Sequence, residues 1–131
     1  MKATKIIAVL ATIAVFAAIA GGLYFLGGPG DWRSYKEDRM RLSDLRRIQN
    51  AISREFYTAK ALPASLEETK LSNETLRDPV TGEHYEYEAI DTRRYRLCAV
   101  FSESSRESVD SARWQHPKGR HCFNLEALDN R

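Results

Sequence analysis

The sequence predicts an α+β fold, in which an N-terminal transmembrane helix is followed by an amphipathic helix packed on a small antiparallel sheet of about three strands. Three patterns support this prediction: an uncharged apolar run, apolar residues at helical spacing, and short stretches of alternating apolar and polar residues. The expected organisation is a short tail at 1–5, a transmembrane helix at 6–26, a Gly/Pro linker at 27–31 and a globular domain at 32–131.

The apolar run from Ile6 to Leu26 contains no charged residue and follows Lys2 and Lys5. As a helix that rises ~1.5 Å per residue it is roughly 30 Å long, which matches the hydrocarbon core of a bilayer. We therefore predict a retained single-pass anchor. The alternative is a signal peptide cleaved near Ala20, which would leave a secreted protein.

The charge balance argues against nucleic acid as a partner. The chain has 20 Lys plus Arg against 18 Asp plus Glu, and removal of Lys2 and Lys5 leaves 18 against 18. Affinity for nucleic acid depends on neutralising phosphate charge. A domain with no net charge is therefore not expected to bind it.

A long amphipathic helix is predicted after the linker, ending near Lys60 because a Leu-Pro pair follows. Its apolar residues recur at three- and four-residue steps: Leu42, Leu45, Ile48, Ile52, Phe56 and Ala59. Basic residues collect on the opposite face: Lys36, Arg39, Arg46, Arg47 and Arg54. This basic face has two interpretations, a contact surface for anionic lipid or an acidic partner, and an ordinary solvated helix face.

An Asp-Pro turn is expected to begin the sheet. Asp78 and Pro79 favour turn initiation, and Gly82 can supply a positive φ. Tyr85 and Tyr87 then alternate with acidic residues, which predicts a half-buried strand.

Two more strands are predicted at 95–101 and 121–125, separated by a polar segment at 102–112 that we expect to be an exposed loop. Both cysteines point away from the apolar face of these strands. Trp114 and Phe123 are expected to lie in the core under the sheet.

This order of elements resembles the pseudopilins of type II secretion and the wider type IV pilin-like class. The resemblance covers roughly residues 40 to 100, and the turn looks like the aspartate-proline turn of the major pseudopilin. The residues that carry it are Leu45, Ile48, Ile52, Tyr57, Leu62, Pro63, Asp78, Pro79, Gly82, Tyr85 and Tyr87. It implies a pilin-like domain outside the cytoplasm that acts by contact with protein partners of the cell envelope.

The N-terminus differs from the pattern of this class. Pilins and pseudopilins carry a glycine followed by a phenylalanine-led apolar run with a glutamate at its fifth position, and Met1 to Ile6 contains neither the site nor the glutamate. The calcium-binding loop of the major pseudopilin is also missing. We therefore expect an interaction or scaffolding protein on a simple inner-membrane anchor, with an accessory pseudopilin-type component as the alternative.

Cys98 and Cys122 lie in predicted adjacent strands. A disulfide between them would close a loop of about 25 residues and contribute roughly 3 to 4 kcal/mol. Disulfides persist in oxidising compartments, so this pairing favours a periplasmic domain. The Lys and Arg flanking the apolar run, more numerous on its C-terminal side, point to a cytoplasmic domain instead, but long domains translocate largely regardless of charge.

A metal or redox site is the rival hypothesis. Zinc accepts two Cys and two His, and the candidates are Cys98, Cys122, His116 and His121. The chain has no Cys-x-x-Cys or His-x-x-x-His pair to preset such a site, and no phosphate loop, nucleophile elbow or His-Glu-x-x-His motif. We therefore predict no catalytic residues, no cofactor and no small-molecule substrate.

Overall fold

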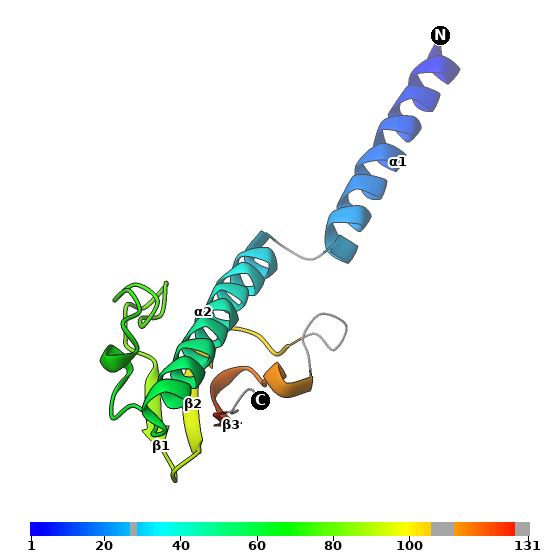
Figure 1. Cartoon of the computed structure of the whole chain (residues 1–131). Coiled ribbons are helices and arrows are strands. Elements are labelled where there is room, and N and C mark those ends of the chain that lie inside the picture. The colour runs from blue at the N-terminus through cyan, green and yellow to red at the C-terminus, as the bar shows by residue number, and fades with distance from the viewer. Residues whose placement is uncertain (27–28, 106–111, 128–131) are drawn as a thin grey trace. The chain divides into compact units, whose positions relative to one another are not determined.

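The computed structural model describes residues 1–26, 29–105 and 112–127, and of residues 26, 29 and 31 only the backbone. The chain divides into two compact units, Met1–Arg33 and Ser34–Arg131, which we describe separately. Helices and an antiparallel sheet follow one another along the chain, which confirms the α+β class (Figure 1).

The first unit is built on α1, the helix Lys2–Leu26. It begins before the predicted span and includes both lysines of the N-terminal tail. Its stretch Lys2–Phe25 is long and apolar enough to cross a membrane, and none of its most apolar part is buried. A membrane anchor and an N-terminal signal sequence share these properties.

The helix α2, Pro29–Ala59, begins earlier than the sequence analysis expects, inside the predicted 27–31 linker. Proline is tolerated in the first turn of a helix, where its missing N–H has no intrahelical partner to lose. Residues 27–28 lie outside the described part of the chain. From Ser34 onward α2 belongs to the second unit.

The sheet has three strands in the order β1-β2-β3, with both neighbouring pairs antiparallel. The strands are β1 Glu86–Ala89, β2 Arg94–Phe101 and β3 Gly119–Glu126, and two short 3₁₀ helices, Leu66–Thr69 and Ala112–Trp114, lie in the connections. The three predicted strands are therefore confirmed, within one or two residues at each end.

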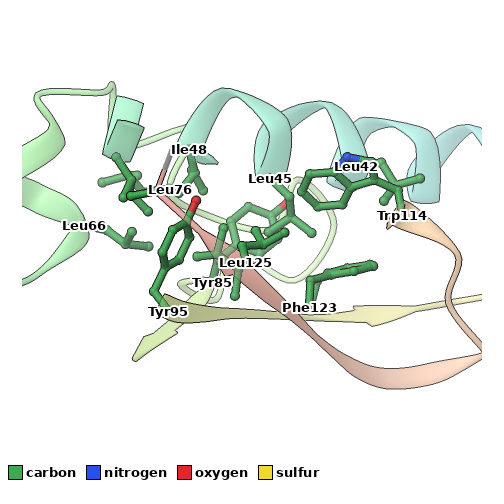
Figure 2. Packing of buried hydrophobic residues seen from close by; sticks show 14 of the residues in the cluster. Leu42, Leu45, Ile48, Leu66, Leu76, Tyr85, Tyr95, Trp114, Phe123 and Leu125 are labelled. Carbon is green, nitrogen blue, oxygen red and sulfur yellow. The ribbon is translucent and has the colours of Figure 1, made fainter. Parts of the chain in front are cut away.

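One hydrophobic core lies between α2 and the sheet, as Figure 2 shows. Leu45 and Ile48 point from the helix toward Tyr95 and Leu125 of the strands. The fully buried large side chains are Tyr95, Phe101, Leu45, Ile48, Ile52 and Leu97. The predicted apolar stripe is confirmed except at its last member, because Ala59 is exposed at the end of α2.

Candidate functional site

The Asp-Pro turn is organised by the side chain of Asp78. Its Oδ1 accepts hydrogen bonds from the backbone N–H groups of Val80, at 2.8 Å, and Thr81, at 3.0 Å. Gly82 donates its N–H to the carbonyl of Asp78 and has the positive φ of 74° that the turn requires. Pro79 is exposed. The sequence prediction of a tight turn is confirmed.

Asp78 also forms a buried ion pair with Arg41 of α2, a contact that the sequence analysis did not predict. Arg41 Nε lies 2.5 Å from Oδ2 of Asp78, and Nη2 lies 3.2 Å from Oδ1. The same guanidinium donates from Nη1 to Asp38 Oδ1 at 2.7 Å. These three side chains, Asp38, Arg41 and Asp78, are at most 8% exposed, and we call them the inner ion cluster.

The inner ion cluster joins three segments that are far apart in the sequence. Asp38 accepts hydrogen bonds from the backbone N–H groups of Ser102, at 2.9 Å, and Glu103, at 2.8 Å. Arg41 Nη1 donates to the hydroxyl of Ser102 as well. The start of the polar segment after β2 is therefore attached to α2. Residues 106–111, the rest of the loop predicted there, lie outside the described residues.

Ionisation of Asp78 and of Arg41 is favoured although both groups are buried. Burial opposes the charged form of Asp78, but hydrogen bonds from Arg41 and from two backbone amides outweigh it and hold the pKa of Asp78 below its ordinary value. Burial likewise opposes the charge of Arg41, and the two aspartates outweigh it and raise the pKa of Arg41. The cluster is therefore a charged, structural connection between the helix and the turn.

The two tyrosines of the turn motif extend this connection. Tyr85 is 5% exposed, and its hydroxyl donates to Asp44 of α2 at 3.4 Å. Burial raises the pKa of Tyr85 and also that of Asp44. Tyr87 is half-buried and donates to the carbonyl of Pro63 at 2.8 Å. The motif that begins the sheet thus contacts both α2 and the segment after it.

The five predicted contact residues of α2 form an exposed surface that we call the outer basic stripe: Lys36, Arg39, Arg46, Arg47 and Arg54. No ion pair joins any of them to a carboxylate of the residues that the structure describes. Arg46 lies 5.8 Å from the ring centre of Trp114, and Arg39 lies over Tyr35 at the same distance. The stripe is therefore a row of exposed positive charge.

Cys98 and Cys122 are direct partners in the β2–β3 register, and their sulfur atoms lie 2.12 Å apart, at disulfide distance. They lie on the sheet face that points away from α2. On that face Arg120 pairs with Glu86 at 2.5 Å and approaches the sulfur of Cys98. Arg96 pairs with Glu88 in the same way. The disulfide is thus flanked by cross-strand ion pairs.

The two histidines of the rival metal hypothesis have other contacts. His116 is buried and stacks on Phe101, with the ring centres 3.6 Å apart. His121 lies edge-on to Phe123 at 4.8 Å, on the core side of β3, whereas Cys122 faces the other side. Within ranges 1–26, 29–105 and 112–127, no group of three or more His, Cys, Asp or Glu side chains is arranged to hold a metal ion.

The sequence contained a signal for the inner ion cluster that its analysis did not use. Asp38 and Arg41 precede Leu45 by seven and four residues, which places both charges on the apolar face of α2. A charged residue at such a position is buried only when it is paired. Its partner Asp78 lies 37 residues beyond Arg41, and helical spacing carries no information on so distant a pair.

Comparisons with protein-family models, with curated proteins and with solved structures found no match to this chain.

Proposed function

We propose that this chain is a single-pass, non-catalytic interaction or scaffolding protein of the cell envelope. In this proposal α1 is retained as an inner-membrane anchor, and the unit Ser34–Arg131 lies in the periplasm. The observation that carries the proposal is the combination of an unburied apolar helix with a cysteine pair at disulfide distance in the following unit. A disulfide of this kind persists where the compartment is oxidising.

The contact surface in this proposal is the outer basic stripe. It is the surface of α2 opposite the core, and its five charges are exposed and form no ion pair with a carboxylate of the described residues. The helix that bears it is held rigidly by the core and by the inner ion cluster. This arrangement of exposed charge on a packed helix supports a function in binding rather than in catalysis.

A pilin-like character of the globular unit is part of the proposal. One helix packed on an antiparallel sheet, with an Asp-Pro turn joined to the helix through Asp78 and Arg41, supports it. We propose a scaffolding role rather than that of a pilus or pseudopilus subunit. An accessory secretion component is the alternative within the same class.

Cell fractionation with a protease tests the proposal. Alkaline carbonate should leave the chain in the membrane fraction, and protease added to cells with a permeabilised outer membrane should digest the globular unit while the inner membrane stays sealed. A cytoplasmic protein serves as the control for sealing. Release of the chain in soluble form would contradict the retained anchor. Protection of the globular unit until the inner membrane is opened would contradict the periplasmic location.

A further inference from the structure

We propose that the outer basic stripe binds the head groups of anionic phospholipids in the membrane that α1 enters. This inference rests on the proposed function, because it needs α1 as a retained anchor. It goes further by naming the chemical class that the stripe recognises, the phosphate of a lipid surface.

The stripe is long and uniform in sign. Lys36 and Arg54 are 18 residues apart, which is about 27 Å along a helix at ~1.5 Å per residue. The acidic residues of this part of α2 lie toward the buried side: Asp38 is buried, and Glu37, Asp44 and Glu55 are only half-exposed. A planar anionic surface can therefore approach the stripe without meeting a carboxylate in the same row.

Four exposed or half-exposed bases outside the stripe are paired with carboxylates, whereas Lys70, Arg93 and Arg113 are exposed without such a pair among the described residues. Arg94 pairs with Asp91, and Lys118 pairs with Glu103. On the sheet face that carries the disulfide, Arg96 and Arg120 pair with glutamates of β1. The stripe has no such ion pair among the described residues, although Asp44 interacts electrostatically with Arg47, so the positive charge of its other members remains available to an external anion.

The covalent connection to α1 favours anionic lipid over an acidic protein as the partner of the outer basic stripe. α2 begins only three residues after α1 ends, and Lys36 follows seven residues later. The chain therefore holds the start of the stripe within a short distance of the bilayer, at high effective concentration. Exposed Trp32 is a residue type that favours the membrane interface. An acidic protein would need its own means of approach, so lipid is the occupant that these features favour.

Reaction of arginines with phenylglyoxal tests the inference on the full chain. The protein is incorporated into nanodiscs of phosphatidylcholine alone, or of phosphatidylcholine with phosphatidylglycerol, and modification is followed by mass spectrometry. We expect Arg39, Arg46 and Arg47 to react about three-fold more slowly in anionic discs, because lipid phosphates cover them. Salt at about 0.5 M should restore the faster rate. Exposed Arg113, outside the stripe, is the internal control and should react equally in both discs.

Two charge variants make the result specific to the stripe. The test variant carries Arg46→Glu, Arg47→Glu and Arg54→Glu, and it should lose the protection of Arg39 in anionic discs. The control carries the same change of net charge elsewhere, at three exposed bases: Lys70→Glu, Arg93→Glu and Arg113→Glu. It should keep that protection. Loss in both variants would show a net-charge effect and overturn the inference.

The possible failures separate the two proposals. If the chain incorporates into discs and the stripe arginines react equally with and without phosphatidylglycerol, lipid binding is wrong and the anchor stands. An acidic protein partner and an ordinary solvated helix face are then the remaining interpretations of the stripe. If the chain is not retained in the discs, the anchor itself is wrong, and with it the basis of the inference.

Discussion

Arg41 and Arg47 lie six residues apart on the same helix and have opposite environments. Arg41 is buried between two aspartates, whereas Arg47 is exposed, forms no ion pair among the described residues and interacts with Asp44 only at longer range. The side chains are identical, so the difference comes from position: Arg41 lies on the apolar face of α2 and Arg47 on the opposite face. The inner face of α2 therefore contributes to the stability of the fold, and the outer face can contact a binding partner.

The largest expected effect is that of Arg41→Met. Removal of the guanidinium leaves Asp38 and Asp78 buried without a counter-charge, which should lower the free energy of unfolding by about 3 to 5 kcal/mol. The matched variant Arg47→Met removes the same group from the outer face and should change it by less than about 0.5 kcal/mol. Urea unfolding of both variants measures the contrast. Equal effects would contradict the division between the two faces.

Loss of the cysteine pair should have the next largest effect. Cys98→Ser with Cys122→Ser removes a cross-link between residues 24 apart in sequence, which should lower the free energy of unfolding by about 2 to 4 kcal/mol. Reduction of the unmutated protein should reproduce this loss, and the double variant should be insensitive to reductant. Equal stability of the oxidised and reduced protein would show that the sheet does not need the disulfide.

Acid should weaken the inner face. Because the pKa of Asp78 is lowered in the folded protein, its contribution to stability is present above the unfolded pKa of about 3.9 and is lost as pH falls through the folded value. Asp91 acts with the same sign, because hydrogen bonds from the backbone N–H groups of Arg93 and Arg94 and from the Arg94 side chain lower its pKa to about 2. Asp44, with a raised pKa, acts with the opposite sign.

The pH dependence can be assigned with Asp78→Asn. Unfolding free energies measured between pH 7 and the acid limit should fall less steeply for this variant than for the unmutated protein, because the asparagine does not titrate. Arg54→Met, which removes an exposed base of the outer face, should retain the full slope. An unchanged slope in Asp78→Asn would mean that the inner ion cluster does not contribute to acid sensitivity.

The smallest effect is expected at Tyr95. Its hydroxyl is buried and has no hydrogen-bond partner among the residues that the structure describes. Tyr95→Phe removes this unsatisfied group while keeping the ring in the core, so stability should stay within about 1 kcal/mol or rise. Thermal unfolding measures it. A larger loss would mean that the hydroxyl has a partner and that the inner face holds a second polar connection.

Local patterns predicted much of the fold. Leu45, Ile48 and Ile52 recur at helical spacing, and the alternation around Cys98 gave both the strand and the face on which the cysteine lies. Two elements were placed less well. Pro29 was assigned to a linker although a first-turn proline fits a helix, and the ion pair between Arg41 and Asp78 was not predicted.

The candidate site was only half predictable for a related reason. The outer basic stripe follows from the sequence because its residues are defined by one helix alone. The inner ion cluster depends on Asp78 and on the backbone of Ser102, which only the tertiary fold brings to Arg41. For charges that pair across distant segments, the local sequence shows only a charged residue on the apolar face of a helix.

The intact mass of the protein from membranes, with free thiols alkylated before any reduction, tests the central claim most directly. The account predicts a species that includes α1 and carries no alkyl group, because α1 is retained and Cys98 is bonded to Cys122. Two alkylated thiols would contradict the oxidising location of the globular unit. A mass that begins near Gly21 would contradict the anchor and indicate a secreted protein.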